Sequence, residues 1–114
     1  MTSNTLTDRE ALYCLCRVPG FGSVTIRSLK DTFGTCLSAW TVKPQELQKS
    51  GVLTERRAEV FLESRKHESA WRKEFAGLAL KNIRFIAECD PDYPNRFLPY
   101  KDRPAALFVK GSLP

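Results

Sequence analysis

The sequence has no long hydrophobic run, and its first residues lack the pattern of a secretion signal. A membrane-spanning helix needs about 20 consecutive apolar residues, and no stretch of the chain approaches that length. The opening residues, MTSNTLTDRE, contain neither a basic flank nor an apolar core, and a signal peptide needs both. We therefore expect a cytoplasmic protein with no membrane partner.

Residues suited to metal binding or catalysis are also scarce. The cysteines are Cys14, Cys16, Cys36 and Cys89, and the single histidine, His67, is far from them in sequence. A Cys-x-Cys pair does not have the spacing of a zinc knuckle, which favours reduced, partly buried thiols over a metal site or a disulfide. No serine or cysteine has a base and an orienting group nearby in sequence. We expect no enzyme activity and no cofactor, and we interpret His67 as an exposed helix residue.

Basic charge is in excess but is not clustered. The 114 residues include 18 Lys and Arg against 13 Asp and Glu, a net charge of +5. Residues 1–80 contain 12 basic and 9 acidic side chains, and residues 81–114 contain 6 and 4. A dispersed excess of this size suits weak binding to a polyanion, but it is also common in soluble proteins. Charge alone therefore favours a nucleic-acid partner only slightly.

Capping signals predict two helices near the start of the chain. The first begins after Thr7, because Thr7 and Glu10 form a capping box, and it ends before Pro19. The second begins near Ser23 and ends at Gly34, which stands where a C-terminal cap belongs. Apolar residues recur at helical spacing in both segments.

The rest of the first 80 residues is predicted to be helical as well. Two short helices and one long helix follow: 35–40, 45–49, and roughly 25 residues from Thr54. We expect the long helix to fray or bend near Gly77. Its polar middle, 63–69, is expected to run through solvent, with ion pairs such as Glu68 to Arg72 on its surface. Arg57 is interpreted as part of the same solvated face.

The composition changes after residue 80. Residues 83–87 and 105–109 have the apolar and β-branched character of strands, and a turn rich in proline and aspartate separates them. A βα alternation is expected to begin here. We predict a mainly α fold, with a small helical bundle at 1–80 and an incomplete α/β segment at 81–114.

Two strands alone are marginally stable in water, and their open edges invite pairing. The nearest apolar surface in the sequence is the end of the long helix, with Trp71, Phe75 and Leu78. The strands are therefore expected either to fold back on that helix or to pair with a second copy of the chain in a homodimer.

The sharpest local motif is the turn Val18-Pro19-Gly20-Phe21-Gly22 between the first two helices, which has the form of a helix-hairpin-helix. Its glycines allow a tight turn and a close approach to phosphate, and Phe21 is expected to anchor the turn in the core. The first amides of the second helix make an anion site. The candidate DNA-binding residues are those of the turn and the hydroxyls and cations beside it: Arg17, Gly20, Phe21, Gly22, Ser23, Thr25, Arg27 and Lys30. Similar turns join helices that never touch DNA, so both interpretations stay open.

Two blocks of the sequence, taken in order, resemble the DprA/Smf family of DNA-processing proteins. The first runs from Leu12 to Gly34 and contains the turn just described. The second block is Asp92-Tyr93-Pro94, Leu98, Asp102, Pro104 and Leu107-Phe108-Val109-Lys110-Gly111. The resemblance implies a SAM-like helical domain with a helix-hairpin-helix, followed by the first strands of a Rossmann-like domain.

The same resemblance implies a function. Proteins of this family bind incoming single-stranded DNA during natural transformation in competent bacteria and help to load the RecA recombinase onto it. They hold DNA mainly through the Rossmann-like domain, with a Gly-Ser-Arg-like phosphate loop that would lie beyond Pro114, so no residue of this chain is assigned that role. The alternative for the chain itself is a protein-interaction or dimerisation module with no direct DNA contact.

Overall fold

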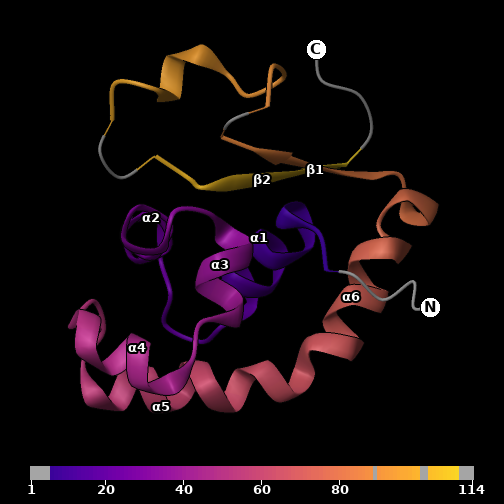
Figure 1. The fold of residues 1–114 in the computed structure, drawn as a ribbon. Coiled ribbons are helices and arrows are strands. Elements are labelled where there is room, and N and C mark those ends of the chain that lie inside the picture. Colours follow the sequence, from indigo (N-terminus) through magenta and orange to yellow (C-terminus); the bar gives the residue numbers. More distant parts are fainter. Residues whose placement is uncertain (1–5, 89, 101–102, 111–114) are drawn as a thin grey trace.

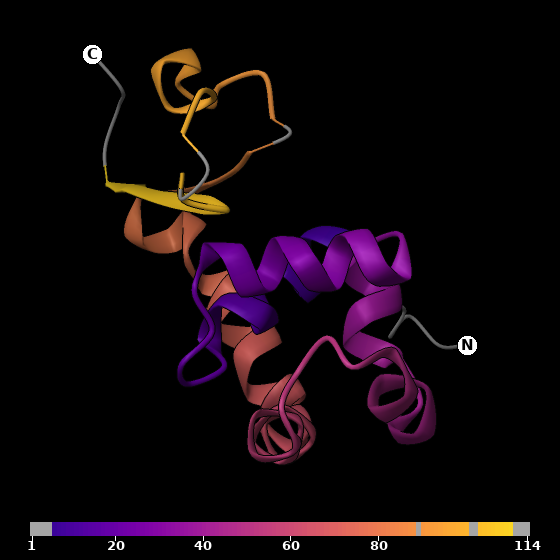
Figure 2. The same cartoon turned by 90° about the vertical axis from the view of Figure 1, so that its left-hand side faces the viewer.

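The computed structural model describes residues 6–88, 90–100 and 103–110. These residues form a mainly helical fold with one small antiparallel sheet. Its elements in chain order are α1 (Asp8–Arg17), α2 (Ser23–Phe33), α3 (Cys36–Thr41), α4 (Pro44–Ser50), α5 (Glu55–Ser64), η1 (Arg65–His67), α6 (Glu68–Gly77), η2 (Ala79–Lys81), β1 (Ile83–Ala87), η3 (Asn95–Phe97) and β2 (Ala106–Lys110). Two views place the strands on one side of α1 and α2, and α5 on the other (Figure 1, Figure 2).

The predicted ends of the first two helices are confirmed, because they depend on local capping interactions. The Thr7 hydroxyl accepts a hydrogen bond from the Glu10 amide at 3.1 Å, and the Glu10 carboxylate accepts one from the Thr7 amide at 2.9 Å. Gly34 ends α2 with a φ of +97°, and Gly51 ends α4 with a φ of +68°. Such positive φ angles favour glycine, so these two residues fix where the helices end.

The core forms around α1, which is enclosed by α2, α3 and α6. Ala11, Leu12, Tyr13, Cys14 and Leu15 are all buried. Five consecutive buried residues cover every side of a helix, since successive positions are about 100° apart. α1 is therefore the central helix of the bundle, and the others present one apolar face each to it.

A chain of aromatic rings continues this core toward α5. The fully buried Phe61 on α5 lies edge-on to Trp40 of α3, with ring centroids 5.5 Å apart, and stacks on Phe21 of the turn before α2 at 5.7 Å. Trp71 of α6 lies 6.2 Å from Trp40. Aromatic pairs at these separations contribute attraction beyond the burial of their area. They hold the turn, α3, α5 and α6 together.

The prediction of one long helix after Thr54 was wrong. The 3-10 turn η1 separates α5 from α6 at 65–67, and α6 ends at Gly77, where the helix was expected to fray or bend. The middle of this segment is only partly in solvent, since four of the seven residues 63–69 are exposed. Ser64 is buried, and the Arg65 guanidinium donates to the carbonyl oxygen of Val42 and lies 5.0 Å from the Phe61 ring centre.

Two more polar side chains of this segment bind distant parts of the chain. The Trp40 indole donates to the Glu68 carboxylate at 2.6 Å. Arg72 forms an ion pair with Glu10 of α1, at 3.2 Å. The polar middle therefore bends around α3 because its side chains satisfy buried hydrogen-bonding groups there.

β1 and β2 lie within one residue of the predicted strands, and they pair antiparallel. Ile83 is opposite Lys110 and Phe85 is opposite Phe108. A parallel pair needs a crossover, usually a helix. The described residues between the strands contain the 3-10 turn η3 and form no such helix, so the chain returns antiparallel.

The strands fold back on the helical bundle, as one of the two expectations proposed. The Phe85 ring lies 5.8 Å from Tyr13 of α1 and 5.3 Å from Phe75 of α6. The Arg9 guanidinium also donates to the Asp90 carboxylate at 2.7 Å and to the Phe85 carbonyl oxygen at 2.5 Å. Apolar and charged contacts thus join residues 83–110 to α1. The domain boundary at 80 stays a prediction.

We predict that Phe61→Ala lowers the free energy of unfolding by about 3–5 kcal/mol, because it removes a buried ring and leaves a cavity. Leu80→Ala is the control, since Leu80 is 92% exposed and surface substitutions usually change stability by less than about 0.5 kcal/mol. Urea unfolding followed by circular dichroism measures both variants. Equal stability of the two would contradict the packing around Phe61.

Candidate nucleic-acid interface

The turn between α1 and α2 is tight and is anchored in the core. Its Phe21 amide donates to the Val18 carbonyl oxygen at 3.2 Å. Gly20 has a φ of +82°, a conformation that a residue with a side chain adopts only with strain. The Phe21 ring packs on Phe61 with an interplanar angle of 21°. The sequence correctly assigned Phe21 as the anchor of the turn.

Gly22 has a different role from the one its place in the motif suggested. It is the N-cap of α2, with φ −98° and ψ −178°, and a Cβ added there would meet no atom within 4 Å. The fold therefore does not require glycine at this position. In the described residues no side chain makes a capping hydrogen bond to the start of α2, its first turn contains no acidic residue, and its N-cap Gly22 is exposed. An uncapped helix start of this kind favours an anion.

The predicted cation Arg17 is engaged in an ion pair. Its Nε lies 3.1 Å from Oε1 of Glu74 on α6, and its guanidinium lies 5.6 Å from the Trp71 ring centre. Tyr13 donates to the same carboxylate at 2.9 Å. Burial and then this hydrogen bond to Glu74 raise the pKa of Tyr13 to about 12. Glu74 thus offsets the charge that Arg17 would present to DNA.

Arg27 and Ser23 of α2 both contact the segment around the strands. The Arg27 side chain is 17% exposed, and its Nε lies 3.3 Å from each carboxylate oxygen of Glu88. The Arg27 guanidinium also donates to the carbonyl oxygen of Arg103. The Ser23 hydroxyl accepts a hydrogen bond from the Ala105 amide at 3.0 Å. The structure therefore places both predicted residues at a junction and not on an open surface.

Sequence reasoning missed Arg57, which binds the turn directly. Its guanidinium donates to the Gly20 carbonyl oxygen at 2.8 Å and to the Thr25 hydroxyl at 3.1 Å, and it lies 5.6 Å from the Phe21 ring centre. Arg57 is on α5 and was interpreted as solvated. No local signal in the sequence distinguishes it from Arg56, because its partners lie 32 and 37 positions away.

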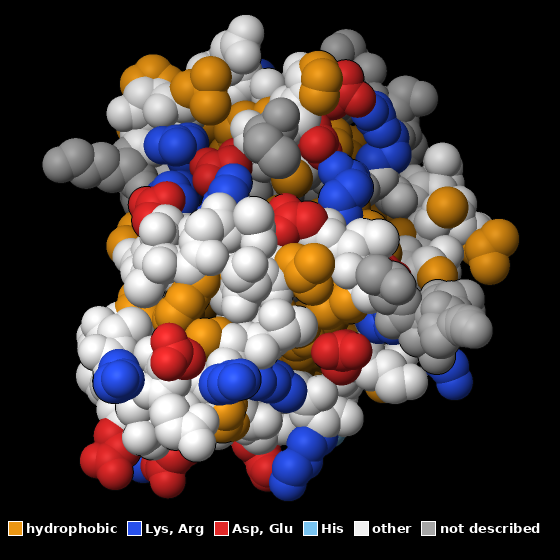
Figure 3. All heavy atoms as spheres, in the orientation of Figure 1, with side chains coloured by type: hydrophobic (Ala, Val, Ile, Leu, Met, Phe, Trp, Pro, Cys, Tyr) orange, Lys and Arg blue, Asp and Glu red, His pale blue; other side chains and the backbone are white. Residues whose placement is uncertain are grey.

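Charges of both signs are interspersed on one face of the molecule. Figure 3 shows Lys and Arg side chains among Asp and Glu on this face, without a continuous basic patch. Lys30, the last of the predicted cations, is half-buried on α2. The net charge of +5 is therefore not gathered in one patch on this face.

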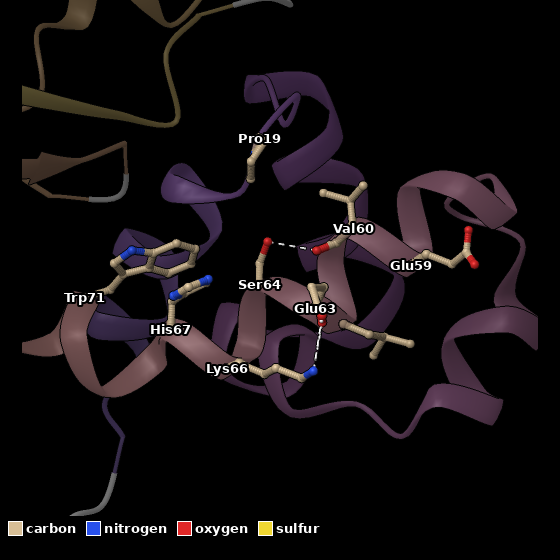
Figure 4. A pocket seen from close by; sticks show the side chains of 9 residues that line it. Pro19, Glu59, Val60, Glu63, Ser64, Lys66, His67 and Trp71 are labelled. Atoms are coloured by element: carbon tan, nitrogen blue, oxygen red, sulfur yellow. Dashed lines mark hydrogen bonds and ion pairs between the residues drawn. The ribbon is translucent and has the colours of Figure 1, made fainter.

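A groove of about 840 Å³ runs beside the turn (Figure 4). Its apolar walls are Pro19 of the turn, Val60 and Leu62 of α5, and Trp71 of α6. His67 is exposed, as predicted, and its ring centroid lies 5.4 Å from that of Trp71. This groove was not foreseen from the sequence, because its walls meet only through the bend at η1.

Two of the cysteines have raised pKa values. Burial raises the pKa of Cys14 to about 12 and that of Cys16 to about 11, so neither is an activated nucleophile at neutral pH. Cys14, Cys16 and Cys36 form no disulfide in the described residues, and Cys89 lies outside them. Within 6–88, 90–100 and 103–110, no group of three His, Cys, Asp or Glu side chains is placed to hold a metal ion.

In the part of the chain that the structure describes, every helix is too short or too polar to cross a membrane. Comparisons of the chain with protein-family models, with curated proteins and with solved structures found no match.

The two glycines of the turn are predicted to respond differently to substitution. Gly20→Ala is expected to lower the free energy of unfolding by about 1–2 kcal/mol, because its φ is +82°. Gly22→Ser is expected to be neutral or slightly stabilising, since serine is a better N-cap than glycine. Urea unfolding of both variants tests this difference. A larger loss at Gly22 than at Gly20 would contradict the turn geometry.

Proposed function

We propose that this chain is the amino-terminal part of a DprA/Smf-type protein that handles single-stranded DNA. In this proposal α1, the turn and α2 form the helix-hairpin-helix of a SAM-like module, and residues 81–114 begin a Rossmann-like domain. The motif order in the sequence supports the family. The observation that carries the DNA function is the uncapped start of α2 beside the tight turn, because backbone amides at such a position bind phosphate oxygens without reading bases.

The contacts of the cations set the expected strength of binding. Arg17 and Arg27 are each paired with a carboxylate, and Arg57 donates to the turn. Binding through the hairpin is therefore weak and independent of base sequence. In the whole protein the resemblance assigns the main DNA contacts to the Rossmann-like domain. Its proposed setting is the bacterial cytoplasm during natural transformation, where it would help to load RecA.

The second candidate is a protein-interaction module, and the groove beside the turn is the observation that favours it. Its walls of Pro19, Val60, Leu62 and Trp71 are apolar, and apolar surfaces at a groove are typical of protein contacts. Phe108 of β2 is also 51% exposed. A homodimer or a contact with RecA would use such surfaces without touching DNA.

The DNA proposal is tested with a fluorescent oligothymidylate and fluorescence anisotropy over a salt series. We expect a Kd of about 10⁻⁴–10⁻⁶ M at physiological salt, which weakens as salt rises. Gly22→Asp is expected to weaken binding at least about tenfold at low salt. Its carboxylate would cap the α2 amides and repel phosphate, and the position has room for a side chain.

The matched control is Gln45→Glu, which makes the same change in net charge in the first turn of α4. It is expected to change the Kd less than about twofold. Equal losses in both variants would show that only net charge matters, and no loss in either would exclude the hairpin as a DNA contact. Binding to a protein partner that is insensitive to salt, without binding to DNA, would favour the second candidate.

A further inference from the structure

Glu88, the residue after β1, is held between two arginines from different segments. Its carboxylate oxygens both lie 3.3 Å from Nε of Arg27 on α2, and Oε2 lies 3.0 Å from Nε of Arg103, which precedes β2. The three side chains are 16%, 17% and 25% exposed. The Arg103 guanidinium donates as well to the Tyr100 carbonyl oxygen at 3.1 Å. Two guanidinium groups thus converge on one largely buried anion.

This arrangement differs from the other ion pairs of the described residues. Glu74 shares its carboxylate between Arg17 and a tyrosine, and both members of that pair are nearly half exposed. The ion-pair partner of Glu10 is Arg72. Within the described part of the chain, Glu88 forms ion pairs with two arginines, Arg27 and Arg103.

The cluster of Glu88, Arg27 and Arg103, called the clamp below, adjoins the start of α2. One turn before Arg27, the Ser23 hydroxyl accepts from the Ala105 amide at 3.0 Å, so its own hydrogen is available to donate. Two arginines and a hydroxyl donor are the groups that bind phosphate oxygens in proteins. A carboxylate and a phosphodiester present their oxygens to a guanidinium in comparable ways, and the arginines of the clamp do not discriminate between them.

We propose that Arg27 and Arg103 form a phosphate site in which Glu88 takes the place of the ligand. The inference rests on the proposed function, because the ligand is a phosphodiester of single-stranded DNA. When the carboxylate withdraws, a phosphate binds the two guanidinium groups in its place. Glu88 therefore restrains DNA binding at the junction between α2 and the strands, and this competition adds to the weakness of the isolated hairpin.

The closing experiment compares three variants of the full chain. Glu88→Gln removes the internal anion, and Glu88→Asp shortens it by one methylene without changing net charge. Glu10→Gln is the matched control, because Glu10 is also a largely buried partner of an arginine, with 18% of its side chain exposed, and glutamine preserves the capping box. Anisotropy with oligothymidylate measures DNA binding. Thermal unfolding in sodium phosphate and in sodium chloride of equal ionic strength measures anion binding without DNA.

For Glu88→Gln we expect about tenfold tighter DNA binding at low salt and a slope of log K against log salt that is steeper by about 0.7, the value for one added phosphate contact on a single strand. Phosphate is expected to raise its Tm by about 4 °C relative to chloride. Adding Arg27→Gln to this variant should abolish both gains. Glu88→Asp is expected to show a smaller gain, and this variant keeps the test open if Glu88→Gln does not fold.

The measurements distinguish a failure of the proposed phosphate site from a failure of the proposed DNA function. If the unaltered chain binds DNA but Glu88→Gln and Glu88→Asp gain no more than Glu10→Gln, the phosphate site is wrong and the proposed function stands. If phosphate stabilises Glu88→Gln while no variant binds DNA at low salt, the anion site stands and the DNA function is wrong.

Discussion

The packing of Phe61 is the contact on which the other parts of the helical fold depend. Its ring touches the turn through Phe21, α3 through Trp40, and the bend after α5 through the guanidinium of Arg65. The turn, α3 and the bend are not paired with one another in a β-sheet. One fully buried ring therefore positions the turn relative to the bend, between which the groove lies.

The electrostatics of the molecule work against a strong DNA site in the described residues. The chain carries a net charge of +5, yet Arg9, Arg17, Arg27 and Arg72 each have a carboxylate partner from a distant part of the chain. Largely buried pairs such as Arg27 with Glu88 are costly to break, because an unpaired charge would remain in a region of low dielectric. The arginines thus serve first to join elements of the fold, and a nucleic acid has to compete for them.

Features set by neighbouring residues were predictable from the sequence. The capping box at Thr7, the glycine caps with positive φ at Gly34 and Gly51, and both strands depend on a few adjacent positions. The bend at η1 was not predictable, because it depends on Arg65 binding Val42 and on Trp40 binding Glu68, across 23 and 28 positions.

Some parts of the candidate site were likewise predictable from the sequence, and others were not. The turn and its anchor Phe21 were predicted, and so was the start of α2. The pairing of Arg17 and Arg27 and the role of Arg57 were not, since their partners are brought near only by the folded chain.

The contacts of Arg9 and Ser23 have a further consequence for where this polypeptide divides. A chain ended near residue 80 would lose the acceptors and donors of Arg9, Ser23 and Arg27, and would expose Tyr13 and Phe75 to water. The helices before residue 80 thus have a surface shaped by the strands, and each part is physically complete only in the presence of the other.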